Sequence, residues 1–441
     1  MSKEFDQDSA PIDDIQLEPI AEDIDDIQQE VAQVEGVKLA SASEDSLSDF
    51  VRDWWIRVRA GDLGSLPIVA GLIAIAIIFG ILEPLFFSSR NFVNLLLQMS
   101  GITTIAIGIV FVLLIAEIDL SVGYVGAVGA IIMALLLRES GPAWPWWLAI
   151  GTGLLITAAI GLLQGTIITK AGVPSFVVTL AGWLVWSGVV LILTTELSTA
   201  GVIVIQNSVV LGIANSFLPA MWGWILWAAA LIVYLGLQLN RRRALQRQEL
   251  PTSPMSLLIL QFIGLAVITG VAVWYANQDR GVPVVALIMG LFLIFWSFVA
   301  ARTRFGRYVY AVGGNPEAAR RAGINVDRIR IYVFMISSFM AGVGGIILAS
   351  RLRSVDTNSG GGNLVLNVIA AAVIGGTSLF GGVGRPLSAL LGALIIASVE
   401  NGMGLLGLPS GIKFVVSGLV LLAAVLIDAF SRRSREASGI A

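Results

Sequence analysis

Two carboxylates lie between long apolar runs in the segment AEIDLSVG (residues 116–123), which contains Glu117 and Asp119. Ionisable groups in membrane-like sequence are costly and usually mark a route for a solute or an ion. One interpretation is a broken helix that lines such a route, where exposed backbone is tolerated because it faces a cavity. The other is a tight turn in which Asp119 or Ser121 caps the next helix.

The remaining chemistry that the chain could perform is narrow. It contains no His and no Cys, which excludes disulfides, thiolate metal sites and the usual proton shuttle. No GxxxxGK[ST] motif occurs, so nucleotide hydrolysis must come from a partner. We therefore predict no catalytic residue, no metal site and no cofactor. Neutral hydrogen-bonding side chains in apolar runs are further candidates for a solute route; they are Asn94, Gln98, Gln164, Thr179, Asn367 and Thr377.

The loop 302–330 contains the signals of a short helix. Asn315 can cap it, Pro316 suits its first position, Glu317 faces its positive end, and Gly323 can terminate it. Such a helix buries nothing of its own between two membrane spans. We expect it to be exposed and to be held by another protein.

The phrase EAARRAG (residues 317–323) resembles the coupling loop by which permease subunits of ABC importers dock into their ATPase. The longer run ARTRFGRYVYAVGGNPEAARRAGINVDRIR, AEIDLSVG and GGTSLFGGVGRP (375–386) are similar to the ribose, xylose and galactose permease family. The RRR-containing insertion and the extra hydrophobic pair around 240–300 are most similar to its xylose permeases. The resemblance is most specific over 302–395, and the acidic head of the chain lies outside it.

The resemblance implies an importer of several parts. A cytoplasmic ABC ATPase, an extracytoplasmic sugar-binding protein and a second permease copy are the expected partners, and no nucleic acid is involved. It also implies which side chains face the ATPase; they are Asn315, Glu317, Ala318, Ala319, Arg320, Arg321 and Gly323. The implied location is the bacterial inner membrane, and the implied cargo is a monosaccharide resembling xylose or ribose.

Composition sets the fold class. The chain has 441 residues, 56% hydrophobic and 13% charged, with a mean hydropathy of +0.87. Soluble domains carry about 25% charged residues, so this is an integral membrane protein. We predict an all-α polytopic protein with about ten to twelve transmembrane helices, some of them broken. The runs are 66–87, 92–116, 121–138, 145–169, 174–194, 220–239, 257–276, 283–300, 331–350, 364–380, 386–406 and 411–430.

Charge patterning sets the expected organisation and orientation. Residues 1–50 hold fifteen Asp and Glu against two Lys and are predicted to form a disordered acidic tail. A juxtamembrane segment, 51–65, precedes the permease domain, 66–430, and a basic tail, 431–441, follows it. Arginine clusters before the first run, after the sixth, within 302–330 and after the last fall on one side if twelve crossings occur. The positive-inside rule then places both termini in the cytoplasm.

Three alternatives remain open. The cargo of an ABC permease could instead be a branched-chain amino acid, a nucleoside or a quorum-signalling sugar derivative. A secondary carrier would need no partners, but no run holds an acid clearly at its midpoint, as a proton-coupled carrier usually does. A membrane enzyme is disfavoured because no His, Cys or paired acids converge in the sequence.

Overall fold

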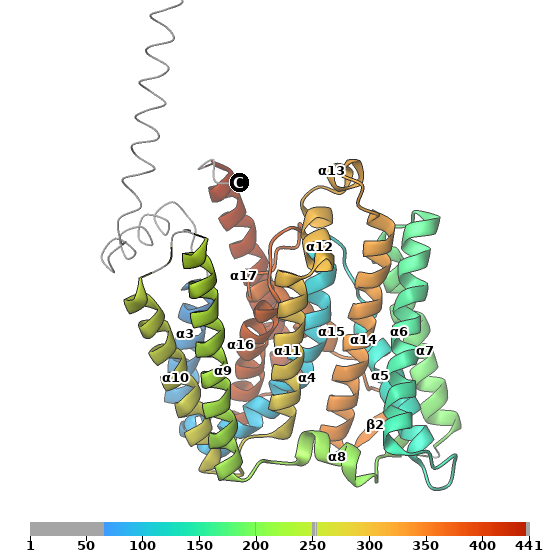
Figure 1. The fold of residues 1–441 in the computed structure, drawn as a ribbon. Helices are drawn as coiled ribbons and strands as arrows, with labels where there is room; N and C mark the ends of the chain where they lie inside the picture. The colour runs from blue at the N-terminus through green and yellow to red at the C-terminus, as the bar shows by residue number, and fades with distance from the viewer. Residues whose placement is uncertain (1–65, 199, 249–251, 253, 438–441) are drawn as a thin grey trace, which may run out of the picture. The chain divides into compact units, whose positions relative to one another are not determined.

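The computed structural model describes residues 66–437 except residues 199, 249–251 and 253 (Figure 1). Among these residues the all-α class is confirmed, because the only strands are β1 (Val202–Val204) and β2 (Ser354–Asp356), which pair antiparallel. The predicted acidic tail 1–50 and the juxtamembrane segment 51–65 lie outside the described residues, as do residues 438–441.

Eight of the described helices are long and apolar enough to cross a membrane. They are α4 (Ser89–Leu114), α6 (Trp146–Ala171), α7 (Ser175–Glu196), α9 (Ala220–Arg247), α10 (Met255–Asn277), α11 (Val284–Arg302), α14 (Val326–Leu352) and α16 (Pro386–Leu405). Shorter apolar stretches occur in α3 (Leu66–Leu82), α5 (Val122–Leu137), α15 (Leu364–Ile374) and α17 (Ser410–Ala437). Each predicted run therefore contains a helix.

The run predicted at 364–380 is wrong in extent. The helix within it, α15, ends at Ile374 and has 11 residues. A helix that crosses a bilayer needs about 20 residues, so α15 alone is too short to span. The chain leaves the helix at Gly375 and Gly376, of which the second has a φ of 97° that favours glycine.

Four short elements connect the longer helices. They are η1 (Pro84–Phe87), α8 (Ser208–Asn215), α12 (Arg304–Gly314) and α13 (Pro316–Arg321). Figure 1 shows α13 at one end of the bundle that contains α14, and α8 and β2 at the other end. We refer to these as the α13 end and the α8 end.

The chain folds as two compact units. Residues 232–265 belong to one unit and form the later part of α9 and the earlier part of α10. The described residues of 57–231 and 266–441 belong to the other, which we call the larger unit. Every residue of the predicted route and of the predicted coupling helix lies in the larger unit.

Helix α14 is the centre of the larger unit, where it packs against α4, α5 and α6. Small residues allow this contact, since lipid-immersed helices associate through close backbone approach. A methyl group added at Gly345 of α14 would overlap the carbonyl oxygen of Gly126 in α5. The contact between α15 and α16 is equally close, because a methyl group at Gly392 would overlap the carbonyl oxygen of Ala371.

This packing predicts that two glycine substitutions differ in their effect on stability. Gly345→Ala should lower the unfolding free energy by about 1–3 kcal/mol, because the added methyl group overpacks the contact between α14 and α5. Gly188→Ala in α7 is the matched control, since nothing lies within 4 Å of an added methyl group there. It should be neutral or stabilising by less than about 1 kcal/mol. Thermal unfolding in detergent measures both, and equal effects would contradict the packing.

Candidate functional site around the broken helix

The predicted short helix is present in the loop 302–330. Asn315 precedes α13, and its side-chain Oδ1 accepts a hydrogen bond from the Ala318 N–H at 2.9 Å. Pro316 occupies the first turn, and Gly323 follows the helix with a φ of 82°. A β-carbon at Gly323 would be strained by this backbone conformation, which explains why glycine ends the helix.

Helix α13 is exposed and packs little against the rest of the larger unit. Of its six residues only Ala319 is buried. Arg320 forms a 2.6 Å ion pair with Glu317 on the same helix. Because both side chains are exposed, this pair contributes little to stability and both groups remain available to a partner. The helix therefore presents a small alanine face flanked by charges.

Helix α12 joins this displayed helix to the membrane-spanning part. The phenol hydroxyl of Tyr310 in α12 donates a hydrogen bond to the carbonyl oxygen of Gly384 at 2.8 Å. Burial raises the pKa of Tyr310, and the nearby charge of Arg385 partly offsets this effect. The phenol is therefore a protonated donor at neutral pH, and it ties α12 to the loop that precedes α16.

A second contact at the end of α12 is made by backbone alone. Gly313 lies against the carbonyl oxygen of Leu114, the last residue of α4, and against the N–H of Gly382. The Gly382 N–H donates to the same Leu114 oxygen at 2.9 Å. A methyl group at Gly313 would overlap both groups. We call the meeting of Gly313, Leu114 and Gly382 the glycine junction, and it places the end of α12 in direct contact with the backbone at the end of α4.

Immediately after this junction the chain is not helical. Helix α4 ends at Leu114 and α5 begins at Val122, and Ala116 between them has a φ of 58°. The break predicted in AEIDLSVG is therefore present. Ser121 occupies the N-cap position of α5, but its side chain makes no capping hydrogen bond. The Ser121 side chain therefore does not cap α5.

Asp119 instead joins the break to α14. Its side chain is 1% exposed. Oδ1 accepts hydrogen bonds from the Ser121 N–H at 3.0 Å and the Ser121 hydroxyl at 2.7 Å, and Oδ2 accepts from the Ser337 hydroxyl at 3.0 Å. Hydrogen bonds to a carboxylate are strong in a low-dielectric interior, so this group holds the two segments together.

Side chains of α6 and α7 also bond to the break. Thr179 donates to the carbonyl oxygen of Ile118 at 3.2 Å, and the Ile118 N–H donates to the Ser175 hydroxyl at 3.3 Å. Gln164 Oε1 lies 3.1 Å from the Ser121 hydroxyl. That hydroxyl has one proton, so it serves either Gln164 or Asp119 at a given time. Gln164 Nε2 has no hydrogen-bond partner among the described residues.

Glu117 points to a different partner. Its Oε1 lies 3.1 Å from an Arg330 guanidinium nitrogen in the first turns of α14. Because α13 is followed directly by α14, this ion pair is a second connection from the displayed helix to the break. The structure thus brings together Glu117, Asp119, Ser121, Gln164 and Thr179 of the nine predicted route residues around one short segment.

The other four predicted residues lie elsewhere. Asn94 accepts a 2.8 Å hydrogen bond from Arg280, and Gln98 accepts a 3.4 Å one from Asn401. Asn367 donates to Glu400 at 2.5 Å, and Thr377 is buried without a partner for its hydroxyl among the described residues. Sequence reasoning did not place Ser175, Ser337, Glu400 or Asn401 among the route residues. The available signal was a polar side chain within an apolar run, which by itself does not reveal its partner.

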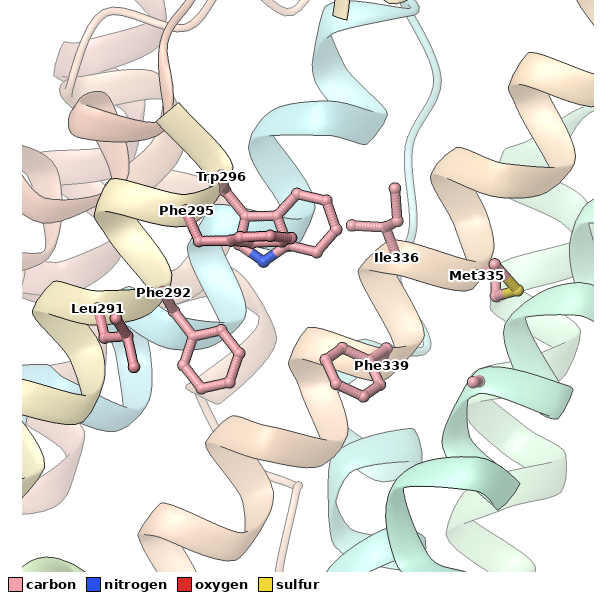
Figure 2. Close-up of a pocket in the computed structure, with 8 residues that line it drawn as sticks. Leu291, Phe292, Phe295, Trp296, Met335, Ile336 and Phe339 are labelled. Carbon is pink, nitrogen blue, oxygen red and sulfur yellow. The ribbon is translucent and has the colours of Figure 1, made fainter. Parts of the chain in front are cut away.

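A pocket of about 590 Å³ lies between α11, α14 and α6, and Figure 2 shows the side chains that line it. They are Ala158, Leu291, Phe292, Phe295, Trp296, Met335, Ile336 and Phe339. The indole N–H of Trp296 donates to the sulfur of Met340 at 3.1 Å, so it is not free for a ligand. This lining offers a sugar no hydrogen-bonding group, and the pocket is therefore distinct from the polar route residues.

Comparison with known proteins places these features in a family. Residues 91–425 match the family model described as the permease component of branched-chain amino acid transport systems. The xylose transport system permease protein of Escherichia coli (strain K12) is 39% identical over 382 residues, which cover 85% of this chain and 94% of that protein. Its counterpart in Haemophilus influenzae (strain Rd) is 36% identical over 378 residues, or 84% and 98% of the two chains.

The ribose import permease protein of Escherichia coli (strain K12) is 33% identical over 366 residues, which cover 82% of this chain and 92% of that protein. No solved structure matches the chain. The family model covers the broken helix, the glycine junction and the displayed helix α13. The chain is therefore a multi-pass membrane protein that belongs to the permease-component family of branched-chain amino acid transport systems.

Proposed function

We propose that the chain is the membrane-spanning subunit of an ATP-driven ABC importer for a monosaccharide of the xylose or ribose type. The observation that carries this proposal is α13, an exposed helix whose only buried residue is Ala319. The relatives named above are permease proteins for xylose and ribose rather than enzymes, which supports both the cargo and the absence of catalysis.

The proposal requires three partners. A cytoplasmic ATPase binds α13, because the chain has no nucleotide-binding motif of its own. An extracytoplasmic sugar-binding protein delivers the cargo at the α8 end. A second copy of the chain completes the route. The small exposed Ala318 lets the ATPase approach closely, and Glu317 and Arg321 supply charges to its groove.

Orientation follows from the arginines. The seven arginines of 302–330 lie at the α13 end, and Figure 1 shows α17 running towards the same end, where Arg432, Arg433 and Arg435 follow in the sequence. The positive-inside rule assigns this end to the cytoplasm. The C-terminus is then cytoplasmic, and twelve crossings place the N-terminus there too. The α8 end faces outwards.

Two connections transmit movement of α13 to the helix break. The first runs through α12 to the glycine junction, where Gly313 touches the last residue of α4. The second runs through α14, whose Arg330 pairs with Glu117. When ATP closes the ATPase dimer, displacement of α13 therefore shifts Leu114, just before the break, and Glu117 within it. ATP and its hydrolysis act only through the difference in binding between the inward and outward states.

Asp119 is the element of the break that has two arrangements in this scheme. Its bond to Ser337 holds the break against α14 in the closed arrangement, and rupture of that bond lets the segment move away. A buried carboxylate that loses the Ser337 donor still accepts from the Ser121 N–H, and the Ser121 hydroxyl can also donate to it, so the transition has a moderate cost. This property suits a gate that must open and close in each cycle.

A branched-chain amino acid is the second cargo to be tested, because the family description names this class of solute. An amino acid is a zwitterion, whereas the xylose and ribose in the names of the relatives are neutral. These names favour a neutral polyhydroxylated solute. ATP-driven uptake of xylose but not of leucine by the reconstituted assembly is the expected result. Uptake of sugar by the purified chain alone under an ion gradient would instead indicate a secondary carrier.

The coupling role predicts loss of ATPase binding from surface changes alone. Glu317→Arg combined with Ala318→Trp should weaken binding of the ATPase about thirtyfold, about 2 kcal/mol, because both side chains lie at the centre of the proposed contact. Buried Ala319 is left unchanged so that the fold is preserved. Co-purification in detergent and ATP-driven uptake are the measurements.

The matched control changes the other displayed helix. Ser208→Arg combined with Val209→Trp alters two exposed residues of α8 at the opposite end of the larger unit. This variant should retain the ATPase. Normal co-purification and uptake by the α13 variant would refute the coupling role.

The gate predicts different effects for two neighbouring serines. Ser337→Ala removes the donor to Asp119 and should lower the unfolding free energy by about 1–3 kcal/mol, because a buried carboxylate oxygen loses its partner. Ser338→Ala is the control, since its buried hydroxyl has no partner among the described residues. That change should be neutral or stabilising. Uptake should change in Ser337→Ala alone.

A double-mutant cycle tests the pair directly. If Ser337 acts through Asp119, the effects of Ser337→Ala and Asp119→Asn on stability should not add. Additive effects, or equal effects of the two serine substitutions, would show that the bond to α14 has no role in the gate. Thermal unfolding in detergent and initial rates of uptake provide both readouts.

A further inference from the structure

Polar side chains from four helices meet near the α8 end of the larger unit, away from the helix break. Asn367 of α15 donates to Glu400 of α16 at 2.5 Å. The next residue, Asn401, donates to Gln98 of α4 at 3.4 Å. Arg351, in the last turn of α14, interacts electrostatically with Glu400. We call Gln98, Arg351, Asn367, Glu400 and Asn401 the outer polar cluster.

The location of the outer polar cluster follows from helix direction. Helix α14 runs from α13 towards the α8 end and finishes one residue after Arg351. Helix α15 begins near that end, three residues before Asn367, and α16 ends five residues after Glu400. The cluster therefore lies in the half of the bundle nearest the α8 end. Asp119 with its partners Ser121 and Ser337, which we call the Asp119 group, lies beside the opposite end of α4.

The charges of the outer polar cluster cannot face lipid. A carboxylate or guanidinium in contact with hydrocarbon is costly, so such groups face the interior of a bundle or a water-filled cavity. Glu400 and Arg351 are nevertheless only partly buried in the isolated chain. Asn367 and Asn401 beside them are 5% and 6% exposed. Their exposed edge must therefore be covered by water, by solute or by the second permease copy.

The chemistry of the outer polar cluster matches a neutral polyhydroxylated solute. A carboxylate accepts hydrogen bonds from two hydroxyls, and amide side chains both donate and accept. Arg351 and Lys413 lie in electrostatic range of the Glu400 carboxylate, so the protein already supplies positive charge near it. A neutral sugar can bind there through its hydroxyls without adding a charge to the site.

The Asp119 group has less hydrogen-bonding capacity left for sugar hydroxyls. Asp119 is 1% exposed, and its carboxylate already accepts three hydrogen bonds from protein groups. The carboxylate of Glu400 has one hydrogen bond among the described residues, from Asn367, and is partly exposed. The outer polar cluster is therefore the group with unused capacity for hydroxyls.

We propose that Glu400, Asn367 and Arg351 form a binding site for sugar hydroxyls in the outer half of the translocation route. This inference rests on the function proposed above and specifies where the sugar first contacts the permease. We place Gln98 and Asn401 beside this site because Asn401 directly follows Glu400 in α16 and donates to Gln98. The sugar leaves this site when the break around Asp119 opens, so binding here is weak and reversible.

The first test measures selectivity in the complete assembly reconstituted in liposomes with its ATPase and binding protein. Glu400→Gln and Asn367→Ala should lower ATP-driven xylose uptake about tenfold, while binding-protein-stimulated ATP hydrolysis remains. Both variants should also lose about tenfold of the preference for xylose over a monodeoxy xylose, because the site no longer distinguishes the missing hydroxyl. Glu196→Gln, which alters an exposed acid at the end of α7, is the matched control and should behave as the unchanged chain.

The second test labels single-cysteine variants. Because the chain contains no cysteine, only the introduced residue can react with a thiol reagent. Gln98→Cys should react with a membrane-impermeant thiol reagent applied from outside. Xylose-loaded binding protein with ATP should slow this reaction at least threefold. Glu196→Cys should react without protection. Gln98 makes only a long hydrogen bond, so its replacement should not prevent folding or membrane insertion. This test therefore still decides whether the outer site exists if Glu400→Gln fails to insert.

The outcomes separate the two proposals. If the unchanged assembly takes up no xylose with ATP, the proposed function itself fails. If it does, but Glu400→Gln and Asn367→Ala retain both the rate and the preference of the unchanged chain, the outer site is refuted. Lack of reaction or lack of protection at Gln98→Cys would overturn it equally.

Discussion

The bilayer interior offers backbone N–H and C=O groups no hydrogen-bond partner, and this constraint governs the arrangement around residues 115–121. The chain leaves helical geometry there, so its polar groups must be satisfied by side chains from neighbouring helices. Thr179 and Ser175 of α7 supply a donor and an acceptor to Ile118, and Ser337 of α14 supplies a donor to Asp119. A break in one helix therefore requires hydroxyls at matching depths on two others.

The contact between the end of α12 and the end of α4 is made by glycine backbone. Under the coupling that we propose, α13 can move the break only if no flexible layer separates them. At the glycine junction, Gly313 lies against the backbone of Leu114 without any intervening side chain. The interiors of proteins are close-packed and transmit displacement over such contacts. The ion pair of Glu117 with Arg330 adds a polar connection beside the steric one.

Two polar groups divide the larger unit along the membrane normal. The Asp119 group is closed and internally satisfied, which suits an element that holds a conformation. The outer polar cluster is partly exposed and has unused hydrogen-bonding capacity at Glu400. The apolar pocket of Figure 2 differs from both, because its aromatic and aliphatic walls match lipid rather than a hydroxylated solute.

Most of the fold could be predicted from the sequence because its physical signals are local. Runs of about 20 apolar residues place the spans, and the cap, proline and glycine of residues 315–323 define α13. The failure at α15 is also physical, because hydropathy continues through Thr377 while Gly375 and Gly376 end the helix. Hydropathy measures transfer to lipid and is insensitive to a backbone turn.

The sequence by itself determined that the chain crosses the membrane, where its helices lie, and that a break falls in AEIDLSVG. Only the tertiary structure decided which polar residues share a site. Asp119 meets Ser337 across 218 positions, and Asn367 meets Glu400 across 33. Helix packing set these pairs, in part through close contacts such as that of Gly108 in α4 with the backbone of Ser337. No local pattern encodes a partner on another helix.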